Sequence, residues 1–528
     1  MKNALTIIII VLMALCGSVT GQTTGSPDLT FNGTGKVVYD RDNMDIYQDV
    51  KVQTDGKIVA VGTSYTPSWS AVIEVTRYLT NGSFDPSFGT GGHFNYSTGV
   101  ETGANKCIIK NDGKILICGY TTDYATYSLV ILQLNENGTP DPAFGTNGVV
   151  VTQTNPGEKN AFAMTLQDDG KILLAGYAVN SDYRNAPVVL RFTTAGVLDI
   201  SFGTNGIATI PVTETDNDFS AIAVQSDGKI VAAGHISNGL SWFSLLVARF
   251  DTNGILDPGY GTDGVINLNL GNVDDEFFDV QLTADDQAIL TGFTVSQGDL
   301  LYHLLLMKFD NGGYPSISFG LDGYTIWGDV PYTFGDAMVL QPDGKILVAG
   351  CTGSLMPANN DWAFWRFNAD GNLDQEFGTN GVVTTDFFGK ADEALGIALH
   401  ENKIILAGKT RNATDKLDFA VARYLNDVNV SVSVPESANL QKFAFSPNPV
   451  KRNGTVSLAY ELTEPGNISI EMVNMTGSVV MNMPIGNQAA GNHASQFRLL
   501  ANINSGVYFL RIRVTQTDYK TAKLVVID

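Results

Sequence analysis

The stretch QPDGKILVAG, residues 341–350, decides the fold, because close copies of it recur along the chain. In each copy an Asp-Gly pair separates two apolar stretches, which is the strongest short-range sequence signal for a β-hairpin. Each copy therefore predicts two antiparallel strands joined by a tight turn. The other close copies are QTDGKIVAVG from Gln53, KNDGKILICG from Lys110, QDDGKILLAG from Gln167 and QSDGKIVAAG from Gln225.

The hairpins recur at a nearly constant spacing. Seven copies, two of them degenerate, indicate one supersecondary unit repeated seven times. Their turn positions are 57 or 58 residues apart and are Asp55, Asp112, Asp169, Asp227, Asp285, Asp343 and Glu401. A second phrase, of which DPAFGTNG is typical, keeps the same spacing and begins at Asp28, Asp85, Asp141, Asp199, Asp257, Ser316 and Asp374.

Each repeat contains four predicted strands. The first and second lie on either side of the Asp-Gly turn, and the third and fourth lie on either side of the DPAFGTNG-like phrase. Four short strands in about 57 residues suit the blades of a β-propeller, an architecture that leaves only short exposed sheet edges. The repeat region begins with the second phrase, at Asp28, and ends with the third strand of a repeat, at 419–424. We therefore predict an all-β fold, a seven-bladed β-propeller over residues 27–427, in which an N-terminal strand near 36–39 completes the last blade.

The phrases LDPxFGxxG and QxDGKIxxxG resemble the delta-60 repeats of bacterial exported proteins. The resemblance covers about residues 27–427 and is specific because both phrases recur at fixed spacing. It implies a propeller-like fold. It implies no reaction and no catalytic residue.

The repeat pattern stops after Leu425, and a different module follows. Residues 428–442 are predicted to form a linker, and residues 443–528 a small β-sandwich of alternating strands. SPNP at 446–449, NMTGSVV at 474–480, SGVYFLRI at 505–512 and KLVV at 523–526 resemble the C-terminal sorting domain of the type IX (Por) secretion system of Bacteroidetes. The resemblance implies that residues 443–528 bind the type IX machinery and that the cargo is then released or attached to the cell surface.

The N-terminus has the pattern of a secretory signal peptide over residues 1–21. Lys2 supplies a positive charge, Ala4 to Leu15 form an apolar stretch, and small residues follow. A lipoprotein signal at Cys16 is the alternative, which Leu15 disfavours because a small residue is needed there. We expect a secreted or outer-surface protein that passes through the periplasm.

The charge and hydropathy of the chain exclude several classes of partner. The sequence has 32 Lys and Arg against 54 Asp and Glu, a net charge of −22, which argues against binding nucleic acid or anionic membranes. No other stretch has the 18 consecutive apolar residues typical of a transmembrane helix. We therefore expect no transmembrane span in the mature chain.

Three cysteines remain after signal-peptide removal: Cys107, Cys118 and Cys351. If Asp112-Gly113 forms a two-residue turn, Cys107 and Cys118 are directly opposite each other. A disulfide is then within geometric reach in an oxidising compartment. No CxxC pair is present, so we do not expect a cysteine zinc site. We also expect no other metal and no cofactor.

Two recurring polar patterns have a structural and a functional interpretation. An arginine and an aspartate eight residues later form an ion pair within a blade or, alternatively, a repeated binding site, and the structural interpretation is favoured because some repeats lack the pair. The Asp-Gly and Asn-Gly turns resemble calcium loops but lack the closing Glu, so they are interpreted as hairpin turns. The arginine–aspartate pairs are Arg77 and Asp85, Arg191 and Asp199, Arg249 and Asp257, and Arg366 and Asp374.

No catalytic motif stands out, and the five histidines are scattered. Carboxylates precede the first strand of several repeats, where they would gather around one mouth of the propeller channel. They would form a polar ligand site or, alternatively, a solvated acidic rim. These residues are Asp45, Asp218, Asp275, Glu276, Asp336 and Asp392.

The loops between second and third strands differ from repeat to repeat and carry aromatic residues, which offer stacking platforms for sugars and anchors for proteins. We predict that a ligand binds on this face, although at least half of the rings should be buried. The leading function is a binding module for glycan or protein. The alternatives are a polysaccharide hydrolase or lyase that uses the channel-mouth carboxylates, and a structural cell-surface component. The rings in question are Tyr65, Trp69, Tyr124, Tyr127, Tyr183, Trp242 and Trp362.

Overall fold

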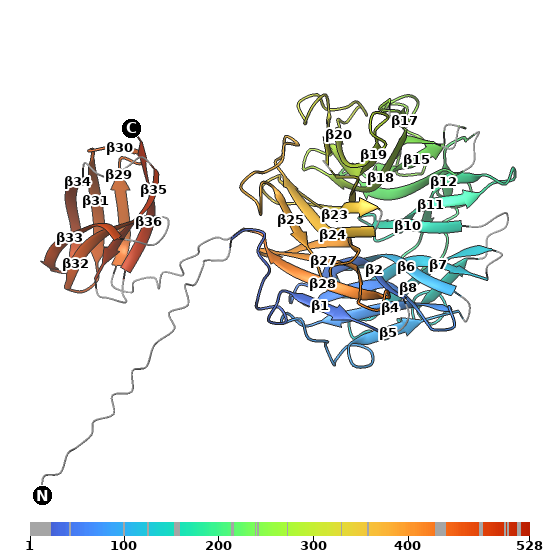
Figure 1. Ribbon diagram of the computed structural model, residues 1–528, viewed down its shortest axis with the longest axis horizontal. Coiled ribbons are helices and arrows are strands. Elements are labelled where there is room, and N and C mark those ends of the chain that lie inside the picture. The colour runs from blue at the N-terminus through green and yellow to red at the C-terminus, as the bar shows by residue number, and fades with distance from the viewer. Residues whose placement is uncertain are drawn as a thin grey trace, which may run out of the picture. The chain divides into compact units, whose positions relative to one another are not determined.

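The computed structural model describes residues 23–41, 44–98, 101–123, 126–152, 159–212, 216–237, 239, 242–271, 273–328, 330–355, 358–427, 440–474, 479–500, 503, 506–514 and 519–527. The predicted signal peptide and most of the predicted linker lie outside these residues. The chain divides into two compact units, Met1–Asp427 and Val428–Asp528. Every regular element in the described residues is a β-strand, as predicted, and none of those residues forms an apolar helix long enough to span a membrane (Figure 1).

The first unit is built from antiparallel groups of four strands in chain order. The first strands are β2 (Met44–Val52), β6 (Glu101–Ile109), β10 (Lys159–Leu166), β14 (Asp218–Val224), β18 (Asp274–Leu282), β22 (Tyr332–Leu340) and β26 (Asp392–His400). The second strands are β3 (Ile58–Tyr65), β7 (Ile115–Thr122), β11 (Ile172–Val179), β15 (Ile230–Ser237), β19 (Ala288–Val295), β23 (Ile346–Leu355) and β27 (Lys403–Arg411).

The third and fourth strands follow in the same order. The third strands are β4 (Ala71–Tyr78), β8 (Tyr127–Leu134), β12 (Asn185–Phe192), β16 (Phe243–Phe250), β20 (Tyr302–Phe309), β24 (Ala358–Phe367) and β28 (Leu417–Leu425). The fourth strands are β5 (His93–Tyr96), β9 (Val149–Thr152), β13 (Ile207–Thr209), β17 (Val265–Leu268), β21 (Tyr324–Trp327) and β25 (Val382–Thr385).

The strand β1 (Lys36–Tyr39) lies antiparallel to β28, with Lys36 opposite Ala422 and Tyr39 opposite Phe419. Figure 1 shows β1, in blue, beside β28, in orange. A buried cluster fixes the segment just before β1: Asp28 accepts from Arg423 Nε and pairs with Lys403 Nζ, both at 2.9 Å. Burial raises the pKa of Asp28, but hydrogen bonds from Lys403 and Thr30 and the charge of Arg423 outweigh it and lower the pKa to about 2.

The second strands are apolar on both faces because each is packed between two neighbouring groups. In β3, Val59 and Val61 pack against Ile117 of the following group, whereas Ile58 and Ala60 pack against the last group. Successive side chains of a strand point to opposite faces, so both sets must be apolar. This sandwiching explains the continuous hydrophobic runs after each Asp-Gly turn.

The repeated arginine–aspartate pairs link consecutive groups. Arg249 Nε donates to Asp257 Oδ2 at 2.9 Å within its own group, and Arg249 Nη1 donates to the carbonyl of Asn311 in the next group at 2.7 Å. The guanidinium also lies 4.4 Å from the centroid of the Tyr260 ring, within cation–π distance. Arg77, Arg191, Arg366 and Arg423 make the corresponding contacts. These contacts support the interpretation of the pairs as structural.

The predicted register of the cysteine hairpin is wrong. Lys110 N donates to Lys114 O at 2.8 Å and Gly113 has φ of 81°, so the turn contains three residues rather than two. An Asp-Gly pair also fits this longer turn, with glycine in the left-handed position. The slip by one residue pairs Cys107 with Ile117 and Lys106 with Cys118.

The register change places the two thiols on opposite faces of the sheet. Cys107 packs with Val59 and Val130, whereas Cys118 packs with Leu174 and Leu190 in a different cluster. Cys107, Cys118 and Cys351 are all free and buried, so the disulfide predicted between the first two is not formed.

The second unit consists of two sheets. In β31, buried and more exposed residues alternate along the strand, which is the pattern of a sheet with one face on a core. Val456, Leu458, Ile470 and Leu510 belong to that core. One sheet contains β29 (Leu440–Ser446), β31 (Thr455–Leu462) and β34 (Gly491–Arg498); the other contains β30 (Val450–Lys451), β36 (Tyr519–Ile527), β35 (Gly506–Arg513), β32 (Gly466–Asn474) and β33 (Val479–Gln488).

Candidate ligand-binding site

The first strands of the groups line two cavities. The larger, of about 730 Å³, is lined by the C-terminal halves of these strands, among them Val52, Ile108 and Leu282. The smaller, of about 270 Å³, is lined by their N-terminal halves. Because the strands are antiparallel, the beginning of each first strand lies beside the end of the second strand. The smaller cavity therefore lies at the end of the sheets from which the variable second-to-third-strand loops emerge.

The charged residues of the larger cavity hold the fold together. Asp49 Oδ2 accepts from Cys107 N of the next group at 3.0 Å, and Asp279 Oδ2 accepts from Met338 N of its next group at 2.8 Å. Lys51 Nζ lies 2.7 Å from Asp49 Oδ1. These carboxylates satisfy backbone donors between neighbouring first strands, so we assign them a structural role.

The smaller cavity is built by β-bulges. Every first strand has a register shift near its middle, and each shift leaves one extra residue. A bulge re-aims the side chain of that residue, and bulges are over-represented next to functional sites. All of the extra residues line the smaller cavity, and they are Gln48, Asn105, Phe162, Ser220, Phe278, Asp336 and Leu395.

Titratable residues complete the lining of this cavity: Lys106, Asp218, His235, Glu276 and Asp336. His235 lies between two carboxyl groups from neighbouring groups of strands. Its Nδ1 is 3.5 Å from Asp218 Oδ1 and 3.7 Å from Glu276 Oε2. Three of the carboxylates predicted at the channel mouth, Asp218, Glu276 and Asp336, thus share one cavity with a histidine and a lysine.

Burial dominates the electrostatics of these carboxyl groups. It raises the pKa of Asp218, and it raises the pKa of Glu276 to about 7 although the nearby His235 has the opposite effect. Burial and the charge of Glu393 hold the pKa of Asp336 well above its ordinary value. Glu276 can therefore change its protonation state near neutral pH.

The other three predicted carboxylates, Asp45, Asp275 and Asp392, do not face an open mouth. All three are almost completely buried. Asp45 Oδ1 accepts from Ser64 Oγ at 2.6 Å and Asp275 Oδ1 accepts from Thr294 Oγ1 at 2.5 Å, and Asp392 pairs with Thr410 in the same way. Each second oxygen accepts a backbone N–H from the connection that precedes the strand. They anchor that connection, so their predicted position at the mouth is wrong.

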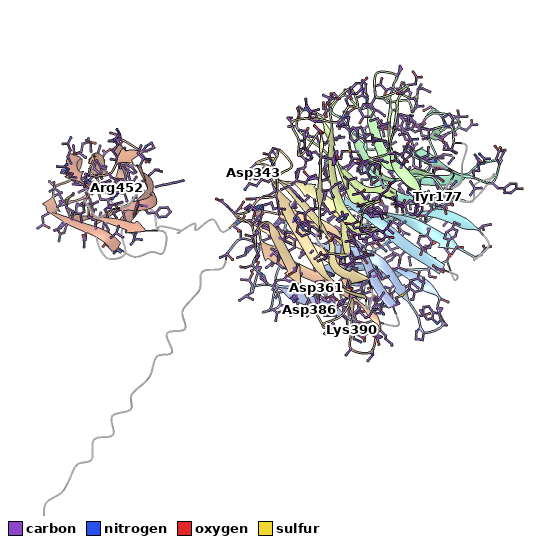
Figure 2. The ribbon with its side chains drawn as sticks, turned by 45° about the horizontal axis from the view of Figure 1, so that its top comes forward. Tyr177, Asp343, Asp361, Asp386, Lys390 and Arg452 are labelled. Carbon is purple, nitrogen blue, oxygen red and sulfur yellow. The ribbon has the colours of Figure 1, made fainter. Side chains whose placement is uncertain are left out.

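Two groups of side chains have ligand atoms close enough together to hold a cation: Asp336, Cys351 and Glu393, and Asp361, Asp386 and Asp392. Figure 2 labels Asp361 and Asp386 next to each other. In both groups a lysine ammonium already supplies positive charge. Lys409 Nζ lies 2.5 Å from Glu393 Oε2, and Lys36 Nζ donates to Asp386 O at 2.7 Å.

The predicted aromatic residues divide into exposed and buried rings. Trp69, Trp242 and Tyr183 are 60%, 46% and 88% exposed, and Tyr127 is also exposed. Tyr65 is half-buried and its hydroxyl donates to Glu101 Oε1 at 3.1 Å. Tyr124 lies outside the described residues.

Trp362 is completely buried, and its Nε1 donates to Lys409 O at 2.9 Å. The prediction of Trp362 as a ligand-face ring is wrong, because β24 already begins at Ala358 and residue 362 lies inside the strand.

The exposed rings of two loops sit on unusual backbone. Trp69 and Tyr183 have φ of 63° and 59°, a left-handed conformation that only glycine adopts without penalty. Their turns have the hydrogen bonds of the Asp-Gly turns: Tyr183 N donates to Asn180 O, just as Gly113 N donates to Lys110 O. A bulky ring therefore occupies the position that holds glycine in the Asp-Gly turns.

Comparison with known families identifies both modules. Residues 445–527 match the secretion system C-terminal sorting domain. This tail marks the protein for export by the type IX system, to the cell surface or the outside. The repeats match a β-propeller domain of unknown function, DUF5122, over residues 53–88, 110–144, 167–202, 225–260 and 341–377.

Solved structures with a similar fold share little sequence with this chain. A polysaccharide lyase, an ulvan lyase in complex with -[GlcA(1-4)Rha3S]-, is 11% identical over 74% of this chain and 96% of its own, with a TM-score of 0.41. A protein of unknown function from Dyadobacter fermentans is 14% identical over 74% and 97%, with a TM-score of 0.38. The β-propeller domain of the Trilobed protease from Pyrococcus furiosus is 9% identical over 74% and 100%, with a TM-score of 0.37. No curated protein matches the chain.

Proposed function

We propose that this exported propeller-repeat protein is a binding protein for glycans, and that the ligand enters the bulge-lined cavity. One observation carries the proposal: a constant scaffold, the β-bulge of each first strand, presents six different types of side chain from seven repeats to the same cavity. Identical repeats would need identical residues there if the bulges served the fold alone. A set that includes amide, hydroxyl, aromatic and carboxyl groups suits recognition of a polar ligand.

The exposed rings support the same proposal, because they lie at the end of the sheets from which the second-to-third-strand loops emerge. Trp242 directly precedes β16, and Phe243 N donates to Asp274 Oδ1 at 2.9 Å, so this ring is tied to the strand that carries Glu276. Trp69 and Tyr183 occupy left-handed positions where a ring costs roughly 1–2 kcal/mol relative to glycine. Sugar faces stack on exposed aromatic rings, which gives a reason to keep these side chains.

The test is binding of the mature protein to a panel of polysaccharides, followed by titration calorimetry with the best ligand. We expect Trp69→Ala and Trp242→Ala to weaken binding about tenfold each, a loss of about 1.4 kcal/mol. Tyr314→Ala is the matched control, because Tyr314 is also well exposed but follows a third strand, at the other end of the sheets. An absence of glycan binding, or an equal effect of Tyr314→Ala, would contradict the proposal.

A polysaccharide hydrolase or lyase is the second candidate, and one observation favours it. The pKa of Glu276 is raised to about 7, and this carboxyl lies 3.7 Å from His235 Nδ1. A general acid or base works best when its pKa is close to the working pH. Release of oligosaccharides by the wild type, and its loss in Glu276→Gln with binding retained, would identify this activity.

For the architecture itself, we propose a closed ring of seven blades. The antiparallel pairing of β1 with β28 and the contact of Arg423 with Thr80 O of the first group support closure. Hydrogen exchange of residues 36–39 would test it: in a closed ring these amides exchange as slowly as those of the other fourth strands.

A further inference from the structure

Two carboxyl oxygens in the bulge-lined cavity have no hydrogen-bond partner among the residues that the structure describes. They are Asp336 Oδ2 and Asp218 Oδ1, and both atoms are buried. His235 Nδ1 lies 3.5 Å from Asp218 Oδ1 but forms no hydrogen bond with it. A buried acceptor without a partner typically costs about 1–3 kcal/mol, so such atoms need an explanation. We infer that the ligand supplies the missing donors and that it is a glycan with free primary amino groups. This inference rests on the function proposed above.

The charge of the cavity favours a cationic group. Asp218, Glu276 and Asp336 line it together, against Lys106 and His235. The positive charge of Lys106 does not act on these three carboxyl groups alone. It also favours the ionised form of Asp49 and Asp279, the buried carboxyls of the larger cavity. Lys409, the other nearby lysine, is paired with Glu393. A carboxylated or sulfated sugar would bring a further acidic group against these carboxyls, whereas an ammonium group would offset their negative charge when they ionise.

The hydrogen-bonding chemistry also favours an amine over a hydroxyl group. A protonated primary amine has three donors and no acceptor, so it matches a carboxyl oxygen that lacks a donor. Hydrogen bonds between a cation and a carboxylate are roughly twice as strong as those between neutral groups. The raised pKa values of Asp218 and Glu276 fit this scheme, because a bound cation stabilises the ionised carboxylates that burial disfavours.

The size of the cavity limits what enters it. A volume of about 270 Å³ lies just below the usual range for small-molecule sites, about 300–1,000 Å³. It therefore suits one sugar unit rather than an extended chain. Flanking units of the polymer would lie over the loops that carry Trp69, Tyr183 and Trp242.

The experiment compares two probes that differ only in the amino group. A β-1,4-linked glucosamine hexamer and its fully N-acetylated counterpart are titrated into the full-length mature protein at neutral pH and moderate salt. We expect the free-amine hexamer to bind at least about tenfold more tightly. Equal affinities, tighter binding of the acetylated hexamer, or binding of neither hexamer would overturn the inference.

Two variants test whether the preference for the amine arises in this cavity. The double variant Asp218→Asn, Asp336→Asn keeps the side-chain shapes and should reduce the preference for the amine to less than about twofold. Asp343→Asn is the control, because Asp343 is an exposed turn residue at the opposite end of the sheets, and it should leave the preference unchanged. An undiminished preference in a folded double variant would overturn the assignment to this cavity.

The experiments distinguish failure of the amine preference from failure of the glycan-binding function. If neither hexamer binds but another polysaccharide binds through Trp69 and Trp242, the inference about the amine is wrong and the glycan-binding function stands. If no polysaccharide binds at all, the proposed function fails with it.

Discussion

Replacing Tyr183 by glycine should stabilise the protein relative to replacement by alanine, while both variants lose ligand affinity. Tyr183 is 88% exposed and has φ of 59°, so its ring contributes little packing and its backbone is in a left-handed conformation. Glycine removes a penalty of about 1–2 kcal/mol for a side chain at this φ. It also adds about 0.5–1 kcal/mol of conformational entropy to the unfolded chain. The net gain of Tyr183→Gly over Tyr183→Ala is therefore about 0.5–1 kcal/mol.

Urea unfolding monitored by circular dichroism measures this difference, with Gly113→Ala as the matched control. Gly113 has φ of 81° in a turn with the same hydrogen bonds, and a Cβ there meets only ordinary contacts. Gly113→Ala should therefore lose about 1 kcal/mol. If Tyr183→Gly is no more stable than Tyr183→Ala, the turn stores no strain. If both variants keep full affinity for the glycan, the ring is not displayed for binding.

Three further outcomes are expected. Burial raises the pKa of Glu276 from 4.5 to about 7, so between these pH values the native state binds more protons than the unfolded state, and stability falls as pH rises through them. The free energy of unfolding of Glu276→Gln should therefore exceed that of the wild type by up to about 3 kcal/mol at pH 8 and by much less at pH 5. Equal gains in urea melts at both pH values would contradict this. Arg423→Met should speed hydrogen exchange at Lys36–Tyr39, whereas Arg249→Met, which removes an equivalent contact elsewhere, should not. Gln133 occupies the arginine position of the second group and donates to Asp141 Oδ2 at 2.7 Å. Gln133→Arg should add a contact to the next group and raise the melting temperature, and a lower one would show that the site cannot hold the guanidinium.

The repeat architecture could be predicted from sequence because the signals were local and occurred several times. The Asp-Gly turns, the apolar runs on both sides of them and the order of the two phrases gave the all-β class and the pairing partner of residues 36–39. The register of the Cys107 hairpin could not be predicted, because an Asp-Gly pair fits both a two-residue and a three-residue turn. That single residue decides which face each thiol occupies.

The candidate site was only partly predictable. Asp275 and Glu276 are neighbours in sequence, yet one anchors a connection and the other lines the cavity, because successive side chains of a strand point to opposite faces. Lys106 and His235 were missed because each interacts with a carboxyl group of another repeat, Asp49 for Lys106 and Glu276 for His235. The bulges have no sequence signature here, since the extra residues of the seven repeats are of six different types. The loops around Trp69 and Tyr183 did carry a signal, the absence of glycine from a tight turn.

The pairing of β1 with β28 sets an order of events during synthesis and export. Residues 36–39 are made early, but their partners at 419–422 emerge nearly four hundred residues later. Until then the N-terminal segment is an unpaired edge, exposed to proteases and to edge-to-edge association. Contacts between distant parts of a chain also form slowly. A cell that exports this protein must therefore shield one unfinished end of the chain until the last repeat has crossed the inner membrane. A variant that lacks residues 417–425 but keeps the sorting domain at 445–527 should be degraded rather than secreted.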